Sequence, residues 1–339
     1  MNENVLKVED LRVYFHTDEG EIRAVNGVSF SMKRGRIMAL VGESGCGKSV
    51  TSYSILRLIQ KPGKIVRGKI IFNSAQGNVT DIAALKESDD QLYDLRGGKI
   101  AMIFQEPMTA LSPVHTIGNQ MCEAILNHQK LSKSEARQKA ITMLAKVGIP
   151  NPERRIDLYP FEMSGGMRQR VVIAMALVCE PEVLIADEPT TALDVTIQAQ
   201  VMGLMKGLQH DMGTSILLIT HDLGVVAQMA DDVAVMYLGR IVEQGTVREV
   251  LKNPRHPYTK GLLNSLPCLA VNKQELPSIK GTVPSLTNIP SGCPFHPRCP
   301  YFKNGVCDIG EVPELTDLGG GRGVACMRVH EIAKEINHV

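Results

Sequence analysis

The sequence predicts an α/β fold with a mixed, largely parallel sheet and a small cysteine-rich domain at its C-terminal end. Short, uninterrupted apolar runs, typical of buried strands, recur along the first 240 or so residues and alternate with stretches of helical spacing. This alternation favours parallel strands joined by helices. The 339 residues are also enough for a main domain and an appended one.

The predicted elements follow in chain order. Residues 5–31 alternate between apolar and polar side chains around an acidic, glycine-containing turn, which indicates a β-rich opening. Buried strands are expected at residues 37–41, 100–104, 183–186, 216–220 and 233–237. Between residues 104 and 183 only helical patterns occur, including 117–128 and 134–147, which predicts a helical insertion. After about residue 246 the pattern weakens and prolines become frequent, so we expect a linker and a small second domain.

The composition is that of a soluble globular protein. The formal net charge of +1 provides no long-range attraction to nucleic acid or to anionic lipid. The longest uninterrupted apolar run, residues 171–178, is too short to cross a bilayer. The N-terminus carries acidic residues where a signal peptide would carry basic and then apolar ones. We therefore expect the chain to stay in the cytosol.

A phosphate-binding loop is predicted at residues 42–49, whose sequence GESGCGKS fits the pattern G-x-x-x-x-G-K-[ST]. A strand is expected before it and a helix, residues 49–59, after it, which disfavours a chance match by a glycine turn. The glycines let backbone N–H groups surround phosphate oxygens, Lys48 adds a positive charge, and the Ser49 hydroxyl can bind Mg²⁺. The residues expected at the nucleotide are Gly42, Ser44, Gly45, Cys46, Gly47, Lys48, Ser49 and Val50.

Two acidic residues end the apolar strand at residues 183–186. Asp187 is positioned to orient the shell of Mg²⁺, and Glu188 to polarise an attacking water molecule, an arrangement that suits hydrolysis. The alternative is that both are solvated carboxylates at the end of a strand.

A second candidate anion-binding turn is formed by Ser164, Gly165 and Gly166 at the start of a predicted helix. Taken alone, such a turn is more often a helix cap. After the phosphate loop, however, the turn resembles the signature motif of the ATP-binding cassette (ABC) ATPases.

Further residues match other motifs of this family. Gln105 resembles the Q-loop glutamine, the segment ending at Asp194 the D-loop, and His221 the switch histidine. Phe15, with Tyr14 as the alternative, resembles the aromatic residue that stacks on adenine, although core packing is an equally good explanation.

The resemblance covers residues 5–250 and implies an ABC ATP-binding domain at residues 1–250, with an antiparallel β subdomain and a helical subdomain at about 106–180. Residues 251–339 would form the C-terminal extension. The family implies that Glu188, His221 and Gln105 are catalytic. It also implies that Mg²⁺ is held by Ser49, Gln105 and Asp187. Two such subunits would bind each ATP between the Lys48 side of one and the Ser164 side of the other.

Two segments resemble the dipeptide/oligopeptide (and nickel) importer branch: residues 104–113, FQEPMTALSP, and residues 253–260, NPRHPYTK. Ser112 stands where most of the branch has asparagine. The tripeptide at 161–163 and Met167 resemble one of the two distinct ATPase subunits in such importers. The resemblance implies a heterodimer with a homologous ATP-binding subunit, two transmembrane permease subunits, an extracytoplasmic substrate-binding protein, and a peripheral position on the cytoplasmic face of the membrane.

The sequence also leaves alternatives to this interpretation. Nickel and oligosaccharide cargoes remain open, and the His-Pro-Tyr string at 256–258 could be an ordinary proline-stiffened linker. A soluble ABC ATPase that acts on nucleic acid or ribosomes usually has two cassettes or long heptad arms. This chain has one cassette and no basic tract, so we expect no nucleic-acid partner. A GTP-dependent switch would need Asn-Lys-x-Asp, and the nearest string, at 272–275, ends in Glu.

The C-terminal region contains four spaced cysteines: Cys293, Cys299, Cys307 and Cys326. Four thiolates in a region with few core residues suit a soft metal centre, and the absence of C-x₂₋₄-C pairs favours a [4Fe–4S] cluster over Zn²⁺. Some peptide-importer ATPases resemble this region and carry such a cluster. Zinc, a mixed ligand set with His296 or His330, and free structural cysteines remain alternatives. Cys46, Cys122, Cys179 and Cys268 are expected to be small buried hydrophobic residues.

Overall fold

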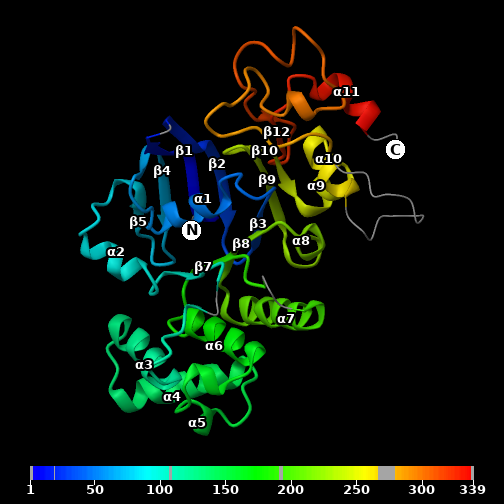
Figure 1. Cartoon of the computed structure of the whole chain (residues 1–339). Helices are drawn as coiled ribbons and strands as arrows, with labels where there is room; N and C mark the ends of the chain where they lie inside the picture. Colours follow the sequence, from blue (N-terminus) through cyan, green and yellow to red (C-terminus); the bar gives the residue numbers. More distant parts are fainter. Residues whose placement is uncertain (1–2, 19, 107–108, 191–193, 266–278, 337–339) are drawn as a thin grey trace. The chain divides into compact units, whose positions relative to one another are not determined.

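Figure 1 shows the computed structural model, which describes residues 3–18, 20–106, 109–190, 194–265 and 279–336. The chain forms two compact units, each assembled from separate segments. The first unit comprises Met1–Leu6, Met32–Arg36 and Phe72–Leu218. The second comprises Lys7–Ser31, Ile37–Ile71 and Ile219–Val339.

The second unit contains the phosphate loop and the C-terminal region. Its elements are most of β1 (Asn4–Thr17), β2 (Gly20–Lys33) and β4 (Gly63–Asn73), together with β3 (Ile37–Val41), α1 (Lys48–Ile55), α8 (Leu223–Met229), β9 (Asp232–Tyr237), β10 (Arg240–Thr246), α9 (Val247–Lys252), α10 (Pro257–Asn264), β11 (Thr316–Asp317), β12 (Gly323–Val324) and α11 (Val329–Ile336). Strand β1 lies between β2 and β4 in one sheet. A second group of strands runs in the order β11-β12-β10-β9-β3. Within it, β3 and β9 are parallel, whereas β9, β10, β12 and β11 pair antiparallel.

Burial explains why β3 and β9 form the centre of this unit. All five residues of β3 are buried, as expected for a strand covered on both faces. Their hydrophobic core extends to Tyr258 on α10 and to Phe295, far along the chain. Val324 on β12 pairs with Glu243 on β10, so the C-terminal residues extend the same set of strands. The structure therefore does not confirm the C-terminal region as a small domain of its own.

The first unit contains the helical segment and the acidic strand. Its elements are β5 (Val79–Asp81), α2 (Asp90–Leu95), β6 (Ile100–Ile103), α3 (Ile117–His128), α4 (Lys133–Lys146), α5 (Pro152–Arg155), α6 (Gly165–Leu177), β7 (Val183–Asp187), α7 (Val195–Met212) and most of β8 (Ser215–Thr220). Strands β6 and β7 are parallel neighbours, with Ile103 opposite Ala186. Helices α3, α4 and α6 pack together, as the green part of Figure 1 shows. Each of the three helices buries apolar side chains, such as Met121, Leu144 and Ile173.

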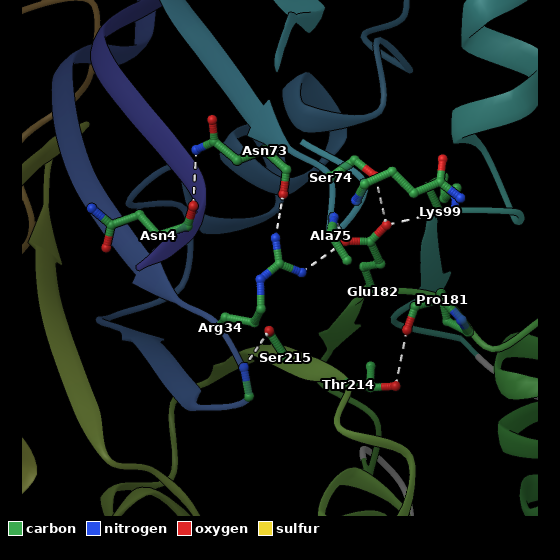
Figure 2. Close-up of polar contacts among 12 residues, drawn as sticks. Asn4, Arg34, Asn73, Ser74, Ala75, Lys99, Pro181, Glu182, Thr214 and Ser215 are labelled. Carbon is green, nitrogen blue, oxygen red and sulfur yellow. Dashed lines mark hydrogen bonds and ion pairs between the residues drawn. The ribbon is translucent and has the colours of Figure 1, made fainter. Parts of the chain in front are cut away.

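Local signals account for the boundaries of these helices. The Thr116 side chain caps α3, and Ser132 and Glu135 form a capping box at the start of α4. Outside the helices, the Glu182 carboxylate accepts hydrogen bonds from the Arg34 side chain, the Ser74 hydroxyl and the Ala75 N–H (Figure 2). These residues lie far from Glu182 in the sequence. Local capping thus sets the ends of the helices, and this polar cluster adds to the apolar core by joining distant segments of the unit.

The structure confirms the predicted strands and the helices at 117–128 and near 134–147, but it differs elsewhere. The helix after the phosphate loop ends at Ile55 rather than near residue 59, and Arg57 then adopts a left-handed φ of 54°. Strand β4 was not predicted, because four of its 11 residues are polar, two are glycine and only four are buried. The segment after residue 246, expected to be a linker, forms α9 and α10. None of the helices in the described ranges is both long and apolar enough to cross a membrane.

Candidate nucleotide-binding site

The phosphate loop between β3 and α1 has a backbone that requires glycine. Gly42, Gly45 and Gly47 all have positive φ angles, of 156°, 78° and 103°. A Cβ atom at Gly42 would lie 2.2 Å from the Met236 carbonyl oxygen, and one at Gly47 would lie 2.3 Å from that of Ala24. At Gly45, by contrast, a Cβ atom would meet nothing within 4 Å. The loop is therefore packed against backbone at two glycines and open at the third.

Lys48 lies beneath this loop. It is 6% exposed, and its ammonium group donates to the carbonyl oxygens of Gly42 at 2.8 Å and Glu43 at 3.1 Å. Gly47 begins α1 without a side-chain cap, so the first amides of the helix keep their capacity to bind an anion. Ser49 and Val50 are half-buried in the first turn of α1, whereas Ser44 is exposed. The arrangement concentrates donors and positive charge, as a polyphosphate site requires.

Cys46 belongs to the loop through its backbone. Its carbonyl oxygen accepts from Gly239 N–H at 2.9 Å, and burial raises the pKa of its thiol. It is therefore a small buried side chain, as the sequence analysis expects of Cys46.

The acidic residues lie at the carboxyl end of β7 in the first unit. Asp187 is fully buried, and Glu188 follows with a left-handed φ of 45°. Because β6 and β7 are parallel and in register, Gln105, just beyond β6, lies at the same edge. Its amide nitrogen is 3.5 Å from a Glu188 carboxylate oxygen. The structure thus brings together Gln105 and Glu188, two residues that the sequence analysis assigned to catalysis.

The predicted signature residues form a helix N-terminus. The Ser164 hydroxyl accepts from Met167 N–H at 3.4 Å and caps α6, with Gly165 and Gly166 in its first turn. A Cβ atom on Gly165 would meet nothing within 4 Å, so this turn is open. Gln169, a residue the sequence analysis missed, is fully buried and donates to the Pro189 carbonyl oxygen, which links α6 to the segment just after Glu188.

The remaining predicted residues have clear local positions. Asp194 caps α7 and accepts from Ile197 N–H at 2.9 Å, while residues 191–193 of the predicted D-loop lie outside the described residues. His221 is exposed immediately after β8. On β1, Phe15 is half-buried beside Gly63, and Tyr14 donates to Asn26 at 2.9 Å.

Two further residues contact the phosphate loop, and sequence reasoning did not identify them. The Tyr258 hydroxyl accepts from Glu43 N–H at 2.9 Å. Arg298 donates to both carboxylate oxygens of Glu43, at 2.7 Å and 3.0 Å. Tyr258 lies in the His-Pro-Tyr string, whose position beside the loop no local pattern reveals.

The four C-terminal cysteines are not confirmed as a metal site. Among the described residues, which include all four, no group of three or more His, Cys, Asp or Glu side chains is arranged so that it could hold a metal ion. Burial raises the pKa of Cys293 to about 11 and of Cys299 to about 12, and nearby thiols add to the rise. The thiols of Cys293 and Cys299 are therefore protonated near neutral pH.

Comparisons with known proteins identify the family of the chain. Residues 25–191 match the family model described as ABC transporter, and residues 242–307 match the model described as oligopeptide/dipeptide transporter, C-terminal region. The chain is 54% identical to the dipeptide transport ATP-binding protein DppD of Bacillus subtilis (strain 168) over 90% of this chain and 89% of that protein. It is 53% identical to the oligopeptide transport ATP-binding protein OppD of the same organism, over 98% and 91%.

Solved structures show the same fold. The chain is similar to the ATP-binding cassette MJ0796 in a dimeric, post-hydrolysis state bound to ADP and Pi, with a TM-score of 0.62 and 26% identity over 72% of this chain and 99% of that one. Its fold is therefore that of an ABC ATPase with mixed α/β sheets. The chain belongs to the family of ATP-binding proteins of dipeptide and oligopeptide ABC transporters.

Proposed function

We propose that this chain hydrolyses ATP to power the import of dipeptides or oligopeptides through a membrane ABC transporter. The observation that carries the proposal is the phosphate loop around Lys48, found in one chain with a region that matches the oligopeptide/dipeptide family. The names of the 54% and 53% identical relatives support the peptide cargo.

The proposed roles follow from the chemistry of the residues. The loop amides and Lys48 hold the phosphates of ATP, and Phe15 stacks on the adenine. Oxygen donors suit a hard cation, and the buried carboxylate of Asp187, the Ser49 hydroxyl and the Gln105 side chain would hold Mg²⁺. When bound, Mg²⁺ neutralises charge on the phosphoryl group that is transferred. Glu188 accepts a proton from the attacking water, and His221 positions the γ-phosphate.

The proposed partners complete a transporter. We propose a second, homologous ATP-binding subunit whose Ser164-like turn closes the site around Lys48, and that the Ser164, Gly165 and Gly166 turn of this chain does the same for the partner. The dimeric state of the similar cassette supports pairing. Two transmembrane permease subunits and an extracytoplasmic binding protein would place the chain at the cytoplasmic face of the membrane.

A reconstitution experiment tests the function. The chain is assembled with its paired ATPase and permeases in proteoliposomes, and phosphate release is measured with the binding protein loaded with dipeptide, oligopeptide, Ni²⁺ or oligosaccharide. Peptide-loaded binding protein is expected to stimulate ATP hydrolysis and peptide uptake. Stimulation by Ni²⁺ or oligosaccharide, with none by peptide, would assign the motor to a different importer.

We also propose that Cys293, Cys299, Cys307 and Cys326 bind a [4Fe–4S] cluster, with Zn²⁺ as the alternative metal. Their number and their spacing, which lacks close C-x₂₋₄-C pairs, support this assignment. Protein purified without oxygen is expected to be brown and to contain iron, and a Cys299→Ser variant to lose both. A colourless protein that contains zinc would identify the alternative, and a metal-free protein would leave four structural thiols.

A further inference from the structure

The second residue of the phosphate loop, Glu43, is held on two sides by the C-terminal half of the second unit. Both terminal nitrogens of Arg298 donate to the Glu43 carboxylate, at 2.7 Å and 3.0 Å. The backbone N–H of Glu43 donates to the Tyr258 hydroxyl at 2.9 Å. The carbonyl oxygen of Glu43 accepts from the Lys48 ammonium group at 3.1 Å. Side chain, amide and carbonyl of Glu43 are therefore all engaged.

Arg298 and Tyr258 are themselves firmly supported. Arg298 is 8% exposed, and its remaining Nε donates to the Lys280 carbonyl oxygen at 3.3 Å. The Tyr258 ring is fully buried and packs on Tyr237 and Phe295, with ring centroids 4.7 Å and 5.4 Å away. These contacts fix both residues before any nucleotide binds.

The segment that carries Tyr258 is fixed in turn by a buried carboxylate. Glu243, fully buried on β10, accepts from the backbone N–H groups of Arg255 and His256, each at 2.9 Å, and from Arg322 at 3.0 Å. His256 then caps α10 by accepting from Tyr258 N–H at 3.1 Å. The segment at 253–260 is therefore an ordered part of the unit that holds Tyr258 in place, rather than a linker.

Charge explains why such a support matters for nucleotide binding. Glu43 belongs to the same short loop as the amides that would bind phosphate. Its negative carboxylate would therefore lie close to a bound polyphosphate and would repel it. The bidentate contact with Arg298 neutralises the Glu43 carboxylate and fixes its position. The Arg298 guanidinium in turn lies over the rings of Phe295 and Tyr237, 6.0 Å and 5.9 Å from their centroids.

We propose that Arg298 and Tyr258 are positioning residues that set the affinity of the phosphate loop for ATP, Arg298 by neutralising and orienting Glu43 and Tyr258 by fixing its amide. The inference rests on the proposed ATPase function and deepens it. Arg298 lies between Cys293 and Cys299 in the sequence. Through its contact with Glu43, the segment that carries these cysteines would therefore contribute to the nucleotide site.

Equilibrium binding of a fluorescent ATP analogue with Mg²⁺ to the full-length chain tests the proposal. Arg298→Met is expected to raise the Kd about tenfold or more, since it leaves the Glu43 charge uncompensated. Glu43→Gln alone is expected to change the Kd less than about threefold, and the double variant to return to the value of Glu43→Gln. A purely structural role of Arg298 predicts no such rescue. Tyr258→Phe retains the ring and is expected to raise the Kd about three- to tenfold.

The controls separate the possible failures. Arg328→Met removes another mostly buried arginine, two residues after Cys326, that contacts Tyr301 and Glu331, and the variant is expected to bind ATP as the wild type does. The inference would be overturned if Arg298→Met and Tyr258→Phe both bound the analogue with wild-type affinity, or if the double variant bound it as weakly as Arg298→Met does. Either result would leave the proposed function standing. A wild-type chain that binds no ATP would overturn the proposed function.

Discussion

Arg34 and Glu182 lie 148 positions apart in the sequence and are joined by a 2.8 Å hydrogen bond in the first unit. The same carboxylate accepts from Ala75 N–H at 2.7 Å and from the Ser74 hydroxyl at 3.0 Å, with Lys99 3.6 Å away (Figure 2). Glu182 is the residue just before β7, the strand that carries Asp187. The cluster therefore fixes the base of the strand that presents the proposed Mg²⁺ ligand.

Replacing Glu182 by Gln is expected to lower the free energy of unfolding by about 2 kcal/mol, because an amide cannot accept all these hydrogen bonds and leaves Arg34 without its charge partner. Burial alone would raise the pKa of Glu182, but hydrogen bonds from Arg34, Ala75 and Ser74 outweigh it and lower that pKa. The stabilisation is therefore present above pH 4.5 and is lost as the pH falls below it.

The matched control for this prediction is Glu180→Gln. Glu180 pairs with Lys139 at 2.9 Å, but its side chain is 64% exposed, against 13% for Glu182. Its replacement should change stability by less than about 0.5 kcal/mol in urea unfolding. Equal losses in the two variants would show that burial does not decide the strength of these pairs.

Replacing Glu188 by Gln should leave ATP binding intact and lower the rate of phosphate release by a factor of about 10² to 10⁴, since the amide cannot accept a proton from water. Labelled-nucleotide binding and phosphate release, measured on the assembled complex, check the two parts separately. Glu180→Gln serves again as the control and should turn over normally. Wild-type hydrolysis by the Glu188→Gln complex would exclude the assigned role.

Hydrolysis by the isolated chain should be slow and should increase with protein concentration or on addition of the partner ATPase, because in the proposed pair each site needs the signature turn of the other subunit. A titration of phosphate release against concentration, with and without the partner, measures this. High activity that is independent of both would contradict a composite site.

Acid should destabilise the second unit through His256. Burial lowers the pKa of His256 to about 3, while a backbone hydrogen bond with Ala325 acts in the opposite direction. Because the unfolded chain takes up a proton near pH 6.5 and the folded chain does not, stability is full above that pH and declines between about pH 6.5 and about pH 3.

The His256→Asn variant tests this prediction, since asparagine can still cap α10 but does not titrate. Between about pH 7.5 and about pH 5.5, the wild type is expected to lose about 1 kcal/mol more of its free energy of unfolding than the variant. Urea unfolding at the two pH values measures the difference. Parallel losses in both proteins would mean that His256 does not carry the effect.

Much of the candidate site could be predicted because its residues are set by local rules. Gly42, Gly45 and Gly47 mark a loop with positive φ angles, and a buried apolar run ending in Asp187 and Glu188 marks a strand that delivers acids to a sheet edge. The contact between Gln105 and Glu188 follows from the parallel register of β6 and β7.

The residues that could not be predicted act across long distances in the chain. Strand β4 has too few buried residues to show a strand pattern, and the helices after residue 246 are short and start beside prolines. Arg298 lies 255 positions from Glu43, and nothing in the residues around either one encodes the contact.

The sequence by itself determined that this chain carries a phosphate-binding loop and a strand ending in two acids, because backbone conformation and strand burial depend on neighbouring residues. The order of these and the other motifs then gave the resemblance to the ABC ATPases. Only the tertiary structure decided that Tyr258 and Arg298 of the C-terminal region contact the phosphate loop. Tyr258 and Phe295 lie in the core with β3 and β9, and Arg298 reaches Glu43 from the segment that carries Phe295, so the contact depends on packing across the whole folded unit.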